Sequence, residues 1–370
     1  MIIKLINGVV FLNNNELKQQ DIFMKDGTVL FKCDENPDLL IDCKGKMILP
    51  GLIDLHVHCY FEKTELGLRT DSIGVKQGVS TVVDAGSSGA DDYEDFLKQQ
   101  ENEVTKVYAF INYSKIGLTK QGKELSSWDY IDEEKLSQAV TNYSDSIKGI
   151  KLRASGSVVK DLGFSPIRKG KEFAKKMNLP VMIHIGNQPP SIEEVLSVVE
   201  KKDIITHIFH GKPGGVLEED GTIKEIVRNK YQEGVIFDIG HGGASLNFEV
   251  AKKAIAQGII PQTISSDLHS RSKGKKLHGL VEVMSKMLAC GMNETEIFQA
   301  TTGNPGKIIG VSNQIVEGAK VDLCILEKID QQTAFIDSEE NEIKTDEYYQ
   351  VFLVIQEGRI ERITEQYENK

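Results

Sequence analysis

The sequence is poor in cysteine, in basic residues and in long hydrophobic runs. Its five cysteines are widely spaced and form no CxxC pair, which excludes a disulfide scaffold and a cysteine-built zinc site and fits a reducing cytoplasm. The 44 Lys and Arg residues against 55 Asp and Glu give a net charge of −11, so we expect no nucleic-acid or anionic membrane partner. No run of about 18 apolar residues occurs, and no basic stretch leads into an apolar one at the N-terminus; we therefore expect no membrane span and no signal peptide.

Short strand patterns occupy both ends of the sequence. Near the N-terminus, alternating apolar residues flank Asn7-Gly8 and Asp26-Gly27, and such dipeptides predict hairpin turns. The C-terminal part predicts further strands at residues 319–327, 351–355 and 359–364. Glu357-Gly358 repeats the turn signal there. Because the two ends share this character, we predict that residues 1–50 and 314–370 pair into one composite β-sandwich domain.

Between these ends, short runs rich in Val and Ile alternate with amphipathic stretches of helical period. The expected strands are residues 52–57, 80–83, 107–111, 149–152, 181–185, 204–209, 235–239 and 263–266. The amphipathic stretches include residues 92–100, 133–139, 167–177, 192–199, 223–232 and 248–256. This alternation predicts an α/β fold, a (β/α)8 TIM barrel over residues 51–313, with functional side chains at the C-terminal ends of its strands.

Histidines gather at these predicted strand ends, although the chain has only eight of them. His56 and His58 end the first strand, and residues i and i+2 of a strand point to the same side. They therefore form a two-point chelate that suits a metal such as zinc. His184, His207 and Asp267 lie at or near the ends of the fifth, sixth and eighth predicted strands, and Lys151 lies in the middle of the fourth.

Three motifs carry a resemblance to a known family. Residues 47–58, Met-Ile-Leu-Pro-Gly-Leu-Ile-Asp-Leu-His-Val-His, look like the opening signature of the amidohydrolase superfamily. Residues 302–310 are similar to its closing helix motif, and residues 318–323 resemble the return into its sandwich domain. The resemblance covers essentially the whole chain and implies a metal-dependent hydrolase.

The binuclear branch of that superfamily implies two divalent ions, expected to be Zn²⁺, and six ligands. These are His56, His58, Lys151, His184, His207 and Asp267. Lys151, as a carbamate formed with CO₂, would bridge the ions, because a plain ammonium group beside them would be repelled. Asp267 would also be the catalytic acid and base for a hydroxide held between the ions. From the residues alone, other roles stay open: a surface lysine, a core histidine at position 184 and a helix cap at position 267.

Four more residues are candidates for contact with a substrate. Arg153 lies two residues after Lys151 and so faces the same side. It would hold a carboxylate or stabilise an oxyanion in catalysis, or else form an ordinary salt bridge. His210, Gly243 and Tyr113 lie in loops after the sixth, seventh and third strands. They are candidate substrate-binding residues, with a loop position, a plain turn and simple packing as the alternatives.

The expected reaction is hydrolysis of an amide, a lactam or an ester. Residues 206–209, Thr-His-Ile-Phe, resemble the sixth strand of the superfamily's deacetylases. This implies removal of an acetyl or acyl group from a small carboxylate-bearing substrate, an N-acetyl amino acid or an O-acetyl hydroxy acid. The alternative is a cyclic amide hydrolase of the dihydroorotase or hydantoinase type.

Two further alternatives fit less well. Lys151 counts against an adenine-type deaminase, and the complete ligand set counts against a catalytically dead scaffold. We expect a cytoplasmic enzyme with a small-molecule substrate, and the sequence is compatible with a homo-oligomer.

Overall fold

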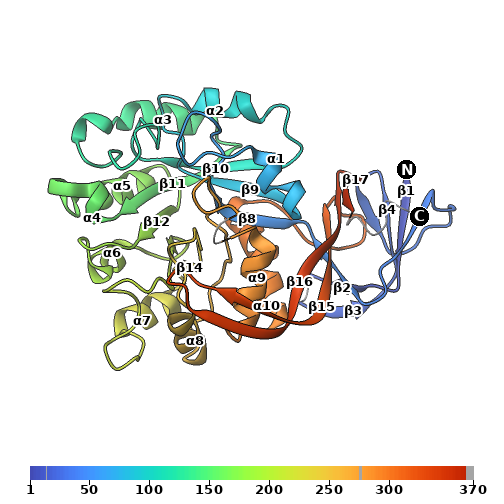
Figure 1. The fold of residues 1–370 in the computed structure, drawn as a ribbon. Helices are drawn as coiled ribbons and strands as arrows, with labels where there is room; N and C mark the ends of the chain where they lie inside the picture. The colour runs from blue at the N-terminus through green and yellow to red at the C-terminus, as the bar shows by residue number, and fades with distance from the viewer. Residues whose placement is uncertain (14, 275–276, 364–370) are drawn as a thin grey trace.

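A parallel seven-stranded sheet lies at the centre of the computed structural model, which describes residues 1–13, 15–274 and 277–363. Its strands, neighbours in chain order, are β8 (Leu52–Val57), β9 (Val79–Ala85), β10 (Lys106–Asn112), β11 (Ile147–Ala154), β12 (Val181–Ile185), β13 (Ile204–Thr206) and β14 (Ile236–Asp238). Each coincides with a strand expected from the sequence. Helices pack around the outside of this half-barrel sheet (Figure 1), so the fold is mixed α/β.

Helices connect consecutive strands, as a parallel sheet requires. Six of them match the amphipathic stretches of the sequence: α2 (Tyr93–Gln100), α3 (Glu133–Asn142), α5 (Ser165–Lys176), α6 (Ile192–Val198), α7 (Glu225–Glu233) and α8 (Phe248–Ala256). Short helices α1 (Thr70–Ile73) and α4 (Gly156–Val159) lie in loops, and α9 (Leu280–Ala289), α10 (Glu294–Thr301) and α11 (Gly303–Ile309) follow the sheet. Local sequence fixes where several helices begin. At the start of α6, for example, Ser191 forms a capping box with Glu194.

The eighth strand expected at residues 263–266 does not form a regular strand. Thr263 makes a single parallel bridge to Asp238 in β14, and Leu268 makes one to Val57 in β8. The segment therefore joins the two edge strands of the seven-stranded sheet. Extended geometry ends at Asp267, whose φ angle of 47° lies in the left-handed region.

Two smaller sheets hold the two ends of the described chain. The first has the order β5-β4-β1-β6, with β1 (Ile2–Ile6), β4 (Ile22–Lys25), β5 (Thr28–Leu30) and β6 (Leu39–Asp42). The second has the order β17-β16-β15-β7-β2-β3, with β2 (Val9–Phe11), β3 (Leu17–Gln19), β7 (Lys46–Pro50), β15 (Leu323–Ile336), β16 (Glu342–Gln356) and β17 (Arg359–Ile363). Apolar side chains of both sheets, among them Ile3, Ile48 and Leu323, form one buried cluster.

The predicted boundaries of a composite domain, residues 1–50 and 314–370, stay a prediction. Residues 364–370, including the expected end of the last strand at Thr364, lie outside the described residues. What the structure shows is that strands from both ends of the chain share one sheet and one hydrophobic cluster.

Two of the predicted hairpin turns are confirmed. The flanking strands pair directly across Asp26-Gly27 and across Glu357-Gly358. All four turn residues have positive φ, as a two-residue type I′ hairpin requires. The hairpin predicted at Asn7-Gly8 is wrong, because β1 and β2 belong to different sheets. The apolar residues on both sides of that dipeptide face the shared cluster, so the chain crosses between the sheets and does not fold back.

The β15–β16 hairpin forms a long arm that reaches from the terminal sheet to the central one (Figure 1). At its tip, Asp337 Oδ2 accepts a hydrogen bond from the backbone N–H of Phe248 at 3.0 Å. Ser338 exchanges two hydrogen bonds of 2.9 Å with the backbone of Leu246. The arm therefore fixes the loop that leads from β14 into α8.

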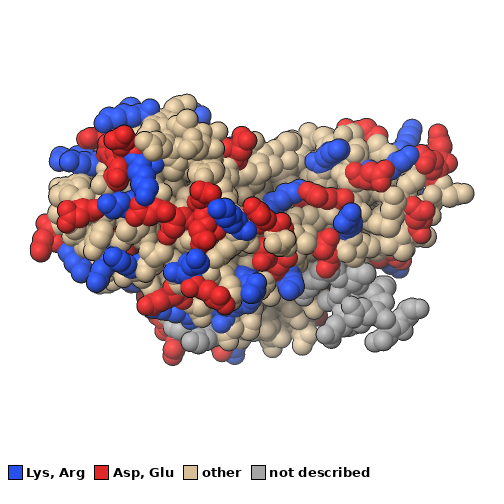
Figure 2. Space-filling view, turned by 90° about the horizontal axis from the view of Figure 1, so that it is seen from above, with Lys and Arg blue, Asp and Glu red and all other residues tan. Residues whose placement is uncertain are grey.

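The surface in Figure 2 carries acidic and basic side chains in close alternation. Among the described residues of this face, they form no continuous basic stripe of the kind that phosphate backbones require. Within the described chain, every helix is too short or too polar to cross a bilayer.

Removal of the Asp337 carboxylate tests the docking of the arm. Asp337→Ala leaves the N–H groups of Phe248 and of the arm tip without their acceptor. We expect the free energy of unfolding, measured by urea denaturation, to fall by about 1–3 kcal/mol. Asp330→Ala changes an exposed aspartate of the same arm and should stay within about 0.5 kcal/mol of the unmodified protein. Equal losses in the two variants would show that the tip contact adds no stability.

Candidate metal centre

A cluster of buried histidines and one aspartate lies at the C-terminal ends of the sheet strands. One possible ligand atom from each of His56, His207 and Asp267 lies within 4.8 Å of the other two. Asp267 Oδ1 is 3.4 Å from His56 Nε2 and 3.2 Å from His58 Nε2. These distances are close enough for the atoms to share one ion.

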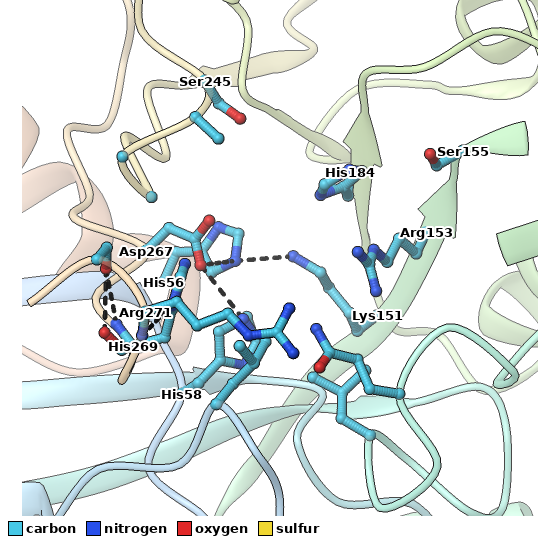
Figure 3. A pocket seen from close by; sticks show the side chains of 18 of the residues that line it. His56, His58, Lys151, Arg153, Ser155, His184, Ser245, Asp267, His269 and Arg271 are labelled. Atoms are coloured by element: carbon cyan, nitrogen blue, oxygen red, sulfur yellow. Dashed lines mark hydrogen bonds and ion pairs between the residues drawn. The ribbon is translucent and has the colours of Figure 1, made fainter. Parts of the chain in front are cut away.

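The other two predicted ligands come from β11 and β12 and face this cluster across the pocket. Figure 3 shows Lys151 and His184 on the side opposite His56, His58 and Asp267. The Lys151 Nζ atom is 3.2 Å from His56 Nε2, and the ring centroids of His184 and His207 are 4.3 Å apart. The structure thus brings together all six residues that the sequence singled out as ligands.

The tautomer of His56 is set by a buried hydrogen-bond chain. Asp238 Oδ2 accepts the hydroxyl hydrogen of Thr206 at 2.7 Å, so Thr206 Oγ1 is left to accept from His56 Nδ1 at 3.0 Å. The proton on Nδ1 leaves Nε2 with a free lone pair aimed at the cluster. Such outer hydrogen bonds orient metal-binding histidines in proteins.

His207 is oriented in the same way by the backbone. Its Nδ1 donates to the carbonyl oxygen of Gly240 at 2.6 Å, which leaves Nε2 as an acceptor. Within the described residues, His207 Nε2 and Asp267 Oδ1 are buried and have no hydrogen-bond partner. Orphaned buried acceptors are costly, and a divalent cation between them would remove the cost. The donor set therefore fits a metal ion.

Backbone conformation at two of these residues is strained. The φ angle of His207 is 71° and that of Asp267 is 47°, values that cost a non-glycine residue about 1–3 kcal/mol and cluster at functional sites. The bend at His207 also ends β13 at Thr206, whereas the sequence pattern predicted a strand as far as residue 209. Gly240 and Gly242 approach so closely that a Cβ on either would overlap Thr206 or Asp267.

Burial controls the protonation of the cluster. It lowers the pKa of His207 to about 3, with the nearby Asp267 opposing the shift. Burial likewise lowers the pKa of His56 and His184 well below the ordinary histidine value. The imidazoles are therefore neutral at pH 7, as metal binding requires.

Lys151 lies in the same apolar setting, with Nζ 3.3 Å from Met182 Sδ. Burial lowers the pKa of Lys151 to about 7, against the opposing effect of Asp267. A large share of this amine is then neutral at physiological pH, and the neutral amine is the form that reacts with CO₂.

A pocket of about 420 Å³ opens onto the cluster. Arg153 and Gly243 line it, as expected. Arg153 Nη1 is 3.0 Å from Oε1 of the buried Glu124, so part of its guanidinium group is already neutralised by a salt bridge.

Two predicted substrate contacts lie elsewhere, since the described residues that line the pocket include neither Tyr113 nor His210. The Tyr113 hydroxyl donates to Glu133 at 2.8 Å, and its ring packs near Phe173. Asn112, one residue earlier, lines the pocket instead, because successive side chains of an extended segment point to opposite sides. His210 is buried, and its Nδ1 accepts the backbone N–H of Lys212 at 3.1 Å.

Sequence reasoning missed several residues that shape the site. Asp238 and Glu124 are buried acids, and nothing in the hydropathy pattern marks them as buried. Lys212 lines the pocket from the glycine-rich loop after β13. The sequence offered one indication of this role, because Lys212 lies two residues after His210, which was itself a candidate substrate contact.

Comparisons with known proteins agree with this geometry. Residues 47–346 match the model of the Amidohydrolase family, and the chain belongs to that family. It is therefore a metal-dependent hydrolase. The chain is 35% identical over 303 residues to a deacetylase of Agrobacterium fabrum, covering 80% of this chain and 74% of the relative. It is 36% identical over 303 residues to a deacetylase of Brucella anthropi, covering 80% and 75%.

Solved structures give a different set of names. A crystal structure of a dihydroorotase aligns with a TM-score of 0.91 at 30% identity and covers 98% of each chain. A crystal structure of an adenine deaminase also aligns with a TM-score of 0.91 at 30% identity, covering 97% of this chain and 98% of the other. The comparisons therefore agree on the family, but the similar proteins are named for different activities.

Thr206→Val tests the orientation of His56. The valine keeps the shape of the side chain but cannot accept the hydrogen of His56 Nδ1 or donate to Asp238. We expect metal affinity, measured by chelator competition, to fall by about 10- to 100-fold.

Ser265→Ala is the matched control, because Ser265 also donates to Asp238 Oδ2 at 2.7 Å but makes no hydrogen bond to His56 among the described residues. Its affinity should change far less. Equal affinities in the two variants would contradict a role for the Thr206 hydroxyl in setting the His56 tautomer.

Proposed function

We propose that the protein is a zinc-dependent deacylase that removes an acetyl or acyl group from a small carboxylate-bearing substrate. An N-acetyl amino acid or an O-acetyl hydroxy acid would suit the pocket, whose volume is about 420 Å³. The observation that carries the proposal is the position of Asp267. Its carboxylate touches the histidine cluster on one side and lines a pocket with cationic side chains on the other.

The residues present would hold two divalent ions. His56, His58 and Asp267 would bind the first ion, His184 and His207 would bind the second, and Lys151, as a carbamate, would lie between them. Bound there, divalent cations lower the pKa of water and polarise a carbonyl group.

Asp267 is placed to move the proton in this reaction. It would accept a proton from the attacking water and pass it to the leaving nitrogen or oxygen. His56 Nε2 and His58 Nε2 lie 3.4 Å and 3.2 Å from Asp267 Oδ1, so an ion bound by all three would hold the carboxylate in position. Arg153 uses Nη1 for Glu124, and its remaining N–H groups are available to a substrate carbonyl or carboxylate.

Two observations bear on the choice of substrate. The curated relatives at 35% and 36% identity are named deacetylases, in agreement with the Thr-His-Ile-Phe pattern of residues 206–209. The solved structure titled as a dihydroorotase, at 30% identity, supports hydrolysis of a cyclic amide as the second candidate.

A hydrolysis screen tests the proposal. Protein purified without chelator should contain about two equivalents of metal per chain, measured by elemental analysis. Zinc-loaded protein should release acetate from N-acetyl or O-acetyl acids and leave hydantoins, dihydroorotate and adenine unchanged.

Ring opening of dihydroorotate or a hydantoin without acetate release would replace the deacylase by the cyclic amide hydrolase. Ammonia release from adenine alone would contradict both candidates. A reproducible metal content near one equivalent would contradict the binuclear centre.

A further inference from the structure

The pocket has a surplus of positive charge in front of the metal-binding cluster. Its cationic lining residues are Arg153, Lys212 and Arg271, apart from Lys151, which a carbamate would make anionic. Asp267 is the one acid among the described residues of the lining. A pocket with this balance attracts an anionic ligand.

Two of these cations already have carboxylate partners. Arg153 is bound to Glu124 at 3.0 Å, and Arg271 forms an ion pair with Glu65. The Lys212 ammonium group has neither a hydrogen bond nor an ion pair within residues 1–13, 15–274 and 277–363. Among the described residues that line the pocket, Lys212 is therefore the cation of these three that has no anionic partner.

The ammonium group lies close to the reacting end of the pocket. A Cβ placed on Gly186 would be 3.4 Å from His184 Nε2 and 3.5 Å from Lys212 Nζ, so these two nitrogens are at most 6.9 Å apart. In an N-acyl amino acid, three bonds separate the carbonyl carbon from the carboxylate carbon, a distance of about 3–4 Å. A substrate whose carbonyl lies at the cluster can therefore place its carboxylate against Lys212.

The loop that carries Lys212 is held from two sides. The buried His210 accepts the Lys212 backbone N–H at 3.1 Å. On the other side, Glu339 at the tip of the β15–β16 arm binds Asn247 Nδ2 at 3.0 Å and lies so close to Gly211 that a Cβ there would overlap it. The charge is thus presented from a fixed position, which reduces the entropy lost when a ligand binds.

Lys212 is also partly desolvated before any ligand arrives. Burial, and then the nearby charge of Arg153, lower the pKa of the Lys212 ammonium group. An anion bound between the two side chains would offset both effects.

We propose that Lys212 binds the substrate carboxylate directly and makes the enzyme selective for acyl acids over neutral acyl compounds. This inference rests on the proposed deacylase function and adds a specificity-determining residue to it. His210 is then a positioning residue that holds Lys212, which accounts for its place behind the pocket wall.

Paired substrates test the proposal. For unmodified enzyme and for Lys212→Met, kcat/KM is measured on an N-acetyl amino acid and on its carboxamide, which differ only in the negative charge. We expect Lys212→Met to lower kcat/KM for the acid by about 10- to 100-fold, mainly through KM, because one charge-assisted contact is lost. The carboxamide value should change by less than about threefold.

Three controls sharpen the result. Lys212→Arg keeps the charge and should retain most of the preference for the acid. Lys169→Met removes an exposed lysine that lies outside the described pocket lining and should leave both substrates unaffected. Arg271→Met removes the cation already paired with Glu65 and should preserve the acid-to-amide ratio.

Failure of this inference can be told apart from failure of the deacylase proposal. An unchanged acid-to-amide ratio in Lys212→Met, or loss of the ratio in Arg271→Met instead, would overturn the role of Lys212 while deacylation stands. If no acyl acid is hydrolysed at all, the deacylase proposal falls. Calorimetry with the free amino acid and its amide then still tests whether Lys212 binds a carboxylate. Lys212→Met should lower the affinity for the amino acid and leave the affinity for the amide unchanged.

Discussion

The buried carboxylate of Asp238 connects the architecture of the sheet to the chemistry of the site. It accepts hydrogen bonds of 2.7 Å from the hydroxyl groups of Thr206, Thr263 and Ser265. Two of these donors lie in the irregular segment that joins β14 to β8, and the third orients His56. Burial raises the pKa of Asp238, and the three hydroxyl donors oppose that shift. A buried acid of this kind is tolerated because its oxygens are satisfied by hydrogen bonds.

Regular structure could be predicted from the sequence because it follows from the pattern of apolar residues. The strands β8 to β12 contain short apolar runs, the helices between them repeat apolar residues with a period of about 3.6, and both lie where expected. The predictions were wrong at residues of the candidate site and at a turn whose flanking strands pack into a core shared by two sheets. His207 and Asp267 adopt positive φ angles, so β13 is shorter than predicted and the eighth strand is irregular. Asn7-Gly8 carries a hairpin signal, yet its flanking strands enter different sheets.

The candidate ligands were easier to predict than the substrate contacts. His56, Lys151 and His184 lie in regular strands, where alternation decides which way a side chain points. The family resemblance implied the remaining ligands, His58, His207 and Asp267, which lie outside the regular strands. Substrate contacts come from loops, whose geometry depends on distant partners. The backbone N–H of Lys212, for example, donates to His210, and the neighbouring Gly211 lies against Glu339 of the β15–β16 arm. A fold does not by itself decide the substrate, and proteins with folds like this one carry the names dihydroorotase and adenine deaminase.

We propose that Lys151 is carboxylated to a carbamate, because this would turn a buried amine into the anion that two divalent cations require. Protein loaded with zinc in ¹³C-labelled bicarbonate should show one carbamate resonance per chain by ¹³C NMR, and Lys151→Ala should lack it and lose metal. Lys148→Ala, which changes a lysine of the same strand whose ammonium lies over the Tyr108 ring, should keep both the resonance and the metal. A fully metal-loaded, active enzyme without any carbamate resonance would show that Lys151 is not carboxylated.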